Sequence, residues 1–285
     1  MSHFKLNRSL FLLIFSMTVG LISCDDSSEA GFSGQTDVET ETNVESYYED
    51  VDDLTHLVSN FSDGSFSGRS SGLDDRLCDG ASLELIRANS NDADTVRIDF
   101  GVTGCTDPRG ITRKGTLLVI FTGDRKSSRS VVFEDFYLNG VKIEGTRTVT
   151  RTTFLPPTFT FTLEDGKVIW PDGTTAEREA SGTRVFYRNG SDPSLDSMVL
   201  KSGGSASGVN RKGKTYSMSI SKDIVFKRSC MEGPKRIFIP VSGIKSVTVD
   251  SRNISVDFGD GTCDDLVTLT VDGVSKEVPL RRDGN

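Results

Sequence analysis

The chain has 285 residues, 41 acidic and 33 basic side chains, and a formal net charge of −8 at pH 7. It contains only two histidines, His3 and His56. This argues against Ser-His-Asp and Cys-His catalysis and against hydrolytic zinc sites, because all of these depend on histidine. Basic residues form only mild clusters in a body that is close to neutral, so no nucleic-acid partner is expected.

The first 24 residues have the pattern of an export signal. Lys5 and Arg8 precede a mostly apolar run from residue 10 to residue 22, and no acidic residue occurs before Cys24. That run is short for a membrane span but typical of a signal-peptide core. It ends in Leu-Ile-Ser-Cys, which resembles the recognition site of lipoprotein signal peptidase. We therefore expect residues 1–23 to be a lipoprotein signal peptide and Cys24 to carry the lipid that anchors the chain to a membrane. An ordinary secretory signal is the alternative.

The segment after Cys24 is strongly acidic. Residues 25–53 contain eleven acids and no Lys or Arg. Removal of Lys5 and Arg8 with the leader changes the net charge from −8 to −10, and subtracting the eleven acids leaves residues 54–285 at about +1. Because residues 24–43 contain almost no apolar side chains, the sequence predicts a disordered acidic tether there. On this interpretation the acidity belongs to the tether and not to the folded body.

Residues 44–61 have the spacing of an amphipathic helix. Apolar residues recur at steps of three and four, which predicts a stem helix between the tether and the body. The apolar positions are Val44, Tyr47, Tyr48, Val51, Leu54, Val58 and Phe61. His56 lies on this helix and would therefore lie outside the β body. Residues 62–76, rich in Gly and Ser, are expected to be a linker.

Residues 77–280 are typical of strands joined by short turns. Apolar and polar residues alternate at 158–163 and 267–271, and Asn-Gly or Asp-Gly pairs at 139–140, 165–166, 189–190 and 272–273, with Pro-Asp-Gly at 171–173, mark turns. About fifteen strands with no βαβ units predict an all-β fold, a large antiparallel meander that forms a sandwich or a strongly curved sheet. Residues 281–285 are expected to form a C-terminal tail.

With Cys24 assigned to lipid, four cysteines remain: Cys78, Cys105, Cys230 and Cys263. An even number in an exported chain indicates two disulfides, with three connectivities open. Two observations favour Cys78–Cys105 with Cys230–Cys263. A hairpin centred near residue 91.5 would place the first pair opposite each other. In addition, residues 99–107 and 257–265 share the pattern D-F-G-x3-C-x-D, which suggests a diverged duplication with one disulfide in each copy.

Three further features of the sequence are candidate ligand sites. Asp257, Asp260, Asp264 and Asp265 could gather around a hard cation, but their spacing matches no calcium loop, and a polar hairpin turn is favoured. Trp170 could stack on a sugar, although capping one end of the β core is favoured. The alternating Thr and Arg residues of 146–152 could form a threonine surface, and an exposed edge strand protected by arginine is favoured instead. No catalytic, cofactor-binding or metal-binding residue is predicted.

The segments 256–280, 136–148 (FYLNGVKIEGTRT) and 166–174 (GKVIWPDGT) together resemble uncharacterised Bacteroidota-type lipoproteins. The resemblance covers most of residues 77–280 and rests on turn and cysteine patterns. It implies a lipid-anchored β protein of the cell envelope with no assigned activity, and it brings no functional residues. Acidic residues after the lipidated cysteine are common in these proteins, where they resemble a signal for surface display. In other bacteria, Asp after the cysteine is instead a signal for inner-membrane retention, and this alternative stays open.

The leading hypothesis is a non-enzymatic binding or structural module of the cell envelope. It would be anchored through Cys24, most simply at the outer membrane, on its periplasmic face or at the cell surface. An envelope glycan, a lipid or a protein could be its partner. Two alternatives are a carboxylate-based glycan hydrolase, which needs two carboxyl groups facing across a cleft, and a carrier of a hydrophobic ligand, which needs a large apolar cavity inside a curved sheet.

Overall fold

The structure is a computed structural model that describes residues 34–62, 77–87, 94–192, 195–231 and 240–280. It contains one α-helix, α1 (Gln35–Ser62), and two 3-10 turns, η1 (Asp124–Lys126) and η3 (Arg228–Met231). The strands are β1 (Ser82–Ile86), β2 (Asp94–Asp99), β3 (Cys105–Thr106), β4 (Thr112–Thr122), β5 (Ser128–Leu138), β6 (Val141–Phe154), β7 (Pro157–Ile169), β8 (Thr175–Tyr187), β9 (Ser197–Leu200), β10 (Ser205–Val209), β11 (Thr215–Lys227), β12 (Ser242–Val249), β13 (Arg252–Asp260), β14 (Leu266–Val271) and β15 (Val274–Pro279).

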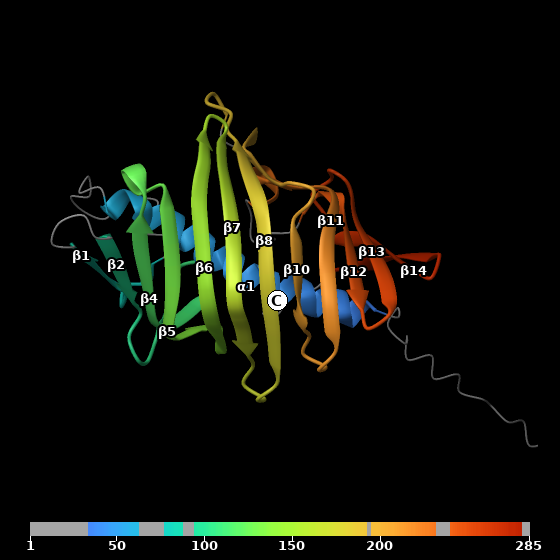
Figure 1. Ribbon diagram of the computed structural model, residues 1–285, viewed down its shortest axis with the longest axis horizontal. Helices are drawn as coiled ribbons and strands as arrows, with labels where there is room; N and C mark the ends of the chain where they lie inside the picture. The colour runs from blue at the N-terminus through green and yellow to red at the C-terminus, as the bar shows by residue number, and fades with distance from the viewer. Residues whose placement is uncertain (1–33, 63–76, 88–93, 193–194, 232–239, 281–285) are drawn as a thin grey trace, which may run out of the picture. The chain divides into compact units, whose positions relative to one another are not determined.

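The strands form one sheet in which every pairing is antiparallel. The strand order follows the chain from β1 to β15, except that β3 pairs only with β4, and β9 pairs with β8 and β11 beside β10. The predicted all-β meander with one N-terminal helix is therefore confirmed, as a single fifteen-stranded sheet and not as two packed sheets. The helix crosses one face of this sheet, behind the strands in the view of Figure 1.

The predicted alternation holds in the long strands. Phe159 and Leu163 of β7 are buried on the helix side, whereas Thr160 and Thr162 are exposed. Asn139-Gly140 and Asp272-Gly273 have the two positive φ angles that a tight hairpin turn requires. The turn predicted at Asp165-Gly166 is wrong, because these residues form a bulge inside β7, where the register with β8 shifts. A positive φ serves a bulge as well as a turn, so the dipeptide alone could not distinguish them.

The helix begins nine residues earlier than predicted, at Gln35 and not at residue 44. Residues 35–43, assigned from the sequence to a disordered tether, are thus part of the folded body, and residues 24–33 lie outside the described part of the chain. The predicted apolar positions from Val44 to Val58 are buried; the side chain of Phe61 is outside the described ones. His56 does not lie apart from the β body, because its ring stacks on Phe186 of β8 and meets Phe159 of β7 edge-on.

Both disulfides have the favoured connectivity, Cys78–Cys105 and Cys230–Cys263. The two D-F-G segments also share their local structure. The backbone N–H of Gly101 donates to the side chain of Asp99 at 2.8 Å, and that of Gly259 donates to Asp257 at 2.9 Å. Phe100 and Phe258 are both buried. Each segment therefore uses the same aspartate turn to lead from a core strand toward a disulfide.

Two apolar clusters lie between the helix and the sheet. One joins the helix from Val44 to Val58 with β2 and the strands up to β8. The other contains Val38 near the start of the helix and the core side chains of β9 to β15. Because α1 contributes to both clusters, its whole length is needed to cover the sheet.

Candidate functional site

Most of the buried polar groups lie in a layer of ion pairs between α1 and the sheet. Six cationic side chains point from the sheet toward the helix and are almost fully buried: Arg113 of β4, Arg129 of β5, Arg147 of β6, Arg178 and Arg184 of β8, and Lys245 of β12. A buried cation is costly unless it is paired. The helix supplies carboxylate partners for five of the six. Glu41, Glu45 and Glu49 follow one another at steps of four and so occupy one face. Asp50 and Asp52 provide the other two.

The pairs follow the helix across the sheet. Glu41 binds Arg178 with 2.8 Å between Oε1 and Nη1, and Glu45 is paired with Lys245. Asp50 receives two hydrogen bonds from Nη2 of Arg113, at 2.7 and 2.8 Å. Glu41, Glu45 and Asp50 therefore neutralise buried cations of the sheet, and the interpretation that the acidity lies outside the folded body is corrected.

Glu49 and Asp52 form the densest part of this layer. Asp52 accepts hydrogen bonds from Arg147 at 2.6 and 3.1 Å and from Arg184 at 3.2 Å, and Glu49 accepts from Arg184 at 2.5 Å. Burial acts to raise the pKa of Asp52, but Arg147 and Arg184 outweigh it and hold that pKa below its ordinary range. For Glu49, burial exceeds the effect of Arg184, so its pKa is raised.

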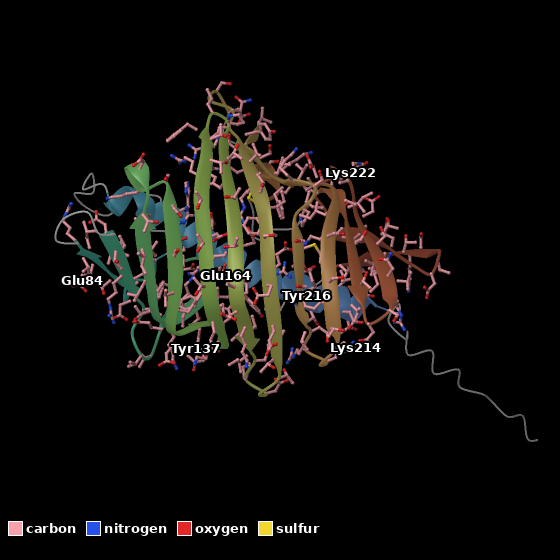
Figure 2. The ribbon with its side chains drawn as sticks, in the orientation of Figure 1. Glu84, Tyr137, Glu164, Lys214, Tyr216 and Lys222 are labelled. Carbon is pink, nitrogen blue, oxygen red and sulfur yellow. A yellow bond between two sulfur atoms is a disulfide. The ribbon has the colours of Figure 1, made fainter. Side chains whose placement is uncertain are left out.

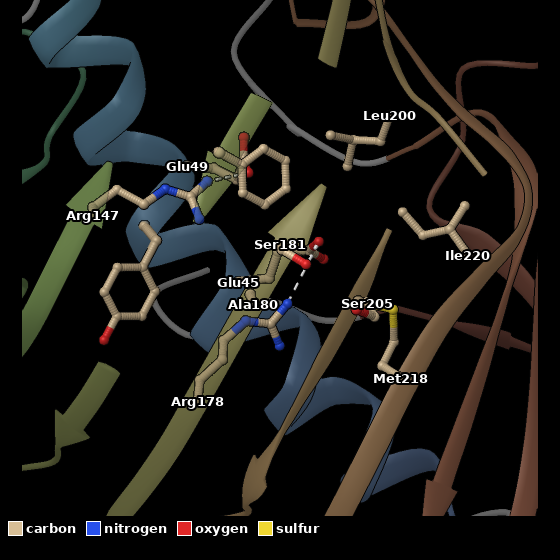
Figure 3. Close-up of a pocket in the computed structure, with 12 residues that line it drawn as sticks. Glu45, Glu49, Arg147, Arg178, Ala180, Ser181, Leu200, Ser205, Met218 and Ile220 are labelled. Carbon is tan, nitrogen blue, oxygen red and sulfur yellow. Dashed lines mark ion pairs between the residues drawn. The ribbon is translucent and has the colours of Figure 1, made fainter. Parts of the chain in front are cut away.

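Two carboxyl groups with opposite pKa shifts are a known feature of acid-base catalysis, but here they are enclosed. The cavity beside Glu49 is lined by Glu45, Tyr48 and Glu49 of the helix and by Arg147, Phe161 and Arg178 of the sheet. Figure 3 labels Glu45, Glu49, Arg147 and Arg178 around it. Only about 20 Å³ of it is open to the centre of a water molecule, which is room for one or two waters. It would not admit a sugar ring or an acyl chain, so it supports neither the hydrolase nor the carrier alternative.

The opposite face of the sheet carries a long row of hydroxyl groups. Residues that face one another in ten successive strands are all Ser or Thr, and none of them is buried. In strand order from β5 to β15 they are Ser130, Thr148, Thr162, Ser181, Ser205, Ser219, Ser246, Ser255, Thr270 and Ser275. Figure 2 looks onto this face. Glu164, which is labelled there, lies on β7 two residues beyond Thr162 of the row. We call these ten residues the hydroxyl row.

The hydroxyl row is neutral and partly internally bonded. It continues past Ser130 through Ile120, Thr95 and Ile86, so no charged side chain occurs in it over thirteen strands. Hydroxyl groups of Ser130 and Thr148 lie 3.0 Å apart. A second row of Thr122, Ser128, Thr150, Thr160 and Thr183 runs beside it. Neighbouring strands lie about 4.8 Å apart, so hydroxyl groups repeat regularly across the sheet.

The threonines of 146–152 belong to this face, and the edge strand predicted for them is wrong. β6 lies inside the sheet between β5 and β7. Arg147 is buried against Asp52 and does not protect an edge. Strand alternation separates the arginines from the threonines as expected, but the sequence of one strand does not reveal which face the helix covers. It also cannot reveal the hydroxyl row, which exists only through the register of ten strands.

The remaining predicted positions are structural. Trp170 is buried at the end of the core, with the Arg211 guanidinium 4.5 Å from its ring, as the capping hypothesis expects. The carboxylates of Asp257, Asp260 and Asp264 accept backbone N–H groups of their own turns, as a polar turn requires. In the described ranges no group of three or more metal-ligating side chains occurs. Cys24 lies outside those ranges.

Comparison with known proteins finds no matching family model, no matching curated protein and no matching solved structure. Among the residues that the structure describes, no helix is long and apolar enough to cross a membrane. The functional argument therefore rests on the chain itself, and the hydroxyl row is its candidate binding surface.

Proposed function

We propose that this chain is an exported, lipid-anchored protein of the cell envelope that acts as a non-enzymatic binding module. The signal-like leader, the Leu-Ile-Ser-Cys motif and the acidic residues after Cys24 support attachment to the outer membrane, as does the resemblance to Bacteroidota-type lipoproteins. Because α1 begins at Gln35, ten residues separate it from Cys24. Even fully extended, they would keep the folded body within about 35 Å of the lipid.

The binding surface that we propose is the hydroxyl row, and its ligand is a neutral, hydroxyl-rich glycan. The observation that carries this proposal is the unbroken succession of ten Ser and Thr residues on the face opposite the helix. Hydroxyl groups both donate and accept hydrogen bonds, as the hydroxyls of a sugar do. A row without charge offers no electrostatic attraction to a polyanion or a polycation, so a neutral polymer is the better complement.

The anchor is tested by mass spectrometry of the protein from its native membrane. The expected N-terminal residue is Cys24 with added acyl mass, and Cys24→Ala should release the protein from the membrane fraction. An unmodified thiol at Cys24 would refute the anchor.

The binding surface is tested by co-sedimentation with insoluble neutral glycans, namely cellulose, chitin and a β-1,3-glucan. A lysine in the middle of the hydroxyl row, as in Ser205→Lys or Ser219→Lys, should abolish binding to whichever glycan the unaltered protein retains, because it inserts a bulky charge into the uncharged row. Val102→Lys is the matched control, since Val102 is 88% exposed on a distant loop. Retention of none of the three glycans, or equal loss in the control, would count against the proposal.

A further inference from the structure

The hairpin that joins two central strands of the sheet has an exposed apolar tip. The hairpin between β6 and β7 places Phe154 and Leu155 at the surface, where they are 61% and 88% exposed. Exposed apolar side chains scattered singly are ordinary, whereas two adjacent ones at the tip of a hairpin mark a candidate interaction site. Neither residue contributes to the apolar clusters under the helix.

Arginines lie directly behind this tip. The guanidinium carbon of Arg151 is 5.2 Å from the centre of the Phe154 ring and 5.0 Å from that of Phe159. Nε of Arg151 is buried and has no hydrogen-bond partner among the described residues. Arg188 follows the end of β8 and is exposed, and it lies close enough to His56 to lower the pKa of that ring.

A third arginine near the tip has no carboxylate in hydrogen-bond contact among the residues that the structure describes. Arg129 is buried, and its hydrogen bonds go to the hydroxyl of Thr55 at 3.2 Å and to the backbone carbonyl of Asp52 at 3.4 Å. Its pKa is lowered to about 10. Burial is the main cause, Arg184, Arg147 and Arg151 act in the same direction, and the negative charge of Asp52 opposes them.

The balance of charge near this tip is positive. Glu49 and Asp52 are paired with Arg147 and Arg184. In the described part of the chain no ion pair joins Arg129, Arg151 or Arg188 to a carboxylate, and all three lie close enough to His56 to lower the pKa of its ring. An anion that approached Arg151 and Arg188 would offset this excess.

We infer that the Phe154–Leu155 tip, together with Arg151 and the exposed Arg188, forms a docking surface for an anionic lipid membrane, with the buried Arg129 behind it. Apolar side chains gain free energy when they enter the headgroup region, and adjacent arginines gain it from lipid phosphates. A neutral ligand would make no ion pair with the arginines, and a small soluble anion would make no contact with the apolar tip. This surface lies apart from the hydroxyl row and does not depend on the lipid at Cys24.

The test uses the full chain carrying Cys24→Ala, so that no acyl chain can contribute, and sedimentation with vesicles of phosphatidylcholine or of phosphatidylcholine with one quarter phosphatidylglycerol. We expect binding to the anionic vesicles only. Leu155→Asp should weaken it about tenfold or more, and Arg151→Gln about fivefold. Arg151→Lys, which keeps the charge, should retain most of the affinity.

Two variants serve as controls in matched settings. Val102→Asp changes another apolar residue that is 88% exposed, and Arg211→Gln changes another arginine stacked on an aromatic ring. Both should bind the anionic vesicles as the unaltered chain does, and circular dichroism confirms that each variant is folded.

Equal binding to neutral vesicles, or losses in the controls as large as in Leu155→Asp, would overturn the inference. So would inorganic phosphate that binds with the same affinity in Leu155→Asp and in the unaltered chain and that displaces the vesicles, since this would identify a small-anion site. These outcomes are distinct from failure of the proposed anchor, which is read from the mass of Cys24, and from failure of glycan binding.

Discussion

At the scale of single residues, Asp52 is where the buried charge converges. Its carboxylate is fully enclosed and accepts hydrogen bonds from two guanidinium groups, those of Arg147 and Arg184. Asp52→Asn would leave both cations buried with only Glu49 to balance them, so we expect a loss of about 3–5 kcal/mol in the free energy of unfolding. Denaturation in urea measures it. Glu39→Gln, which alters a helix acid without a basic partner in the layer, should cost less than about 0.5 kcal/mol. Equal losses in the two variants would show that the pairs do not hold the layer together.

His56 gives the fold a dependence on pH. Burial, with the positive charges of Arg129, Arg188, Arg151 and Arg184 acting in the same direction, lowers its pKa from 6.5 to about 4. Between pH 6.5 and 4 the unfolded chain therefore binds a proton that the folded chain does not, so stability should fall as the pH falls through that window. The expected contribution is on the order of 2–3 kcal/mol. In His56→Gln this contribution should be absent, which thermal denaturation at pH 7 and pH 4.5 would reveal as a shallower decline. An equally steep decline of stability with pH in the variant would show that His56 is not the group responsible.

At the scale of elements, the first nine residues of α1 distinguish the structure from the sequence prediction. Val38 is buried in the second apolar cluster, and Glu41 is paired with Arg178. Val38→Ser with Glu41→Gln should therefore cost about 4–7 kcal/mol, whereas a true tether would tolerate both changes. The matched control is Thr36→Ser with Glu39→Gln in the same turns of the helix, with an expected cost below about 1 kcal/mol. Chemical denaturation distinguishes the two cases. An unchanged free energy of unfolding in the Val38→Ser, Glu41→Gln variant would support the tether interpretation.

The same helix shows why part of the fold was predictable and part was not. Its apolar positions from Val44 onward follow a helical period, and they are buried as predicted. Glu41 and its neighbours carry no such signal, because an acid that faces a buried arginine looks the same in sequence as one that faces water. Strand alternation likewise predicted the two faces of β6 and β7. Which face meets the helix depends on a contact between Arg147 and Asp52, which are 95 residues apart in the chain. The hydroxyl row depends on register in ten strands, which no local pattern specifies.

At the scale of the whole molecule, the sheet is continuous but its core is divided. One apolar cluster lies under the strands up to β8 and the other under β9 to β15, and the ion pairs of Arg178 and Arg184 lie where they meet. The disulfides lie in different halves. Cys78 belongs to the first cluster, whereas Cys230–Cys263 links the turn after β11 to the loop after β13, in the half of the sheet that covers the second cluster. The helix and the β8 charges therefore join two halves that the sheet also connects through the pairing of β8 with β9 and β10.

This arrangement predicts how the disulfides combine. They close loops of similar length, with sequence separations of 27 and 33 residues, so removing either by paired Cys→Ser substitution should cost about 3–4 kcal/mol through the entropy of the unfolded chain. Because the bridges lie in different halves of the sheet and share no partner, the cost of removing both should equal the sum of the two within about 0.5 kcal/mol. Guanidinium denaturation of the four forms completes the cycle. A combined cost that departs from the sum by more than 1 kcal/mol would mean that the clusters are coupled through the sheet more tightly than the charge layer alone allows.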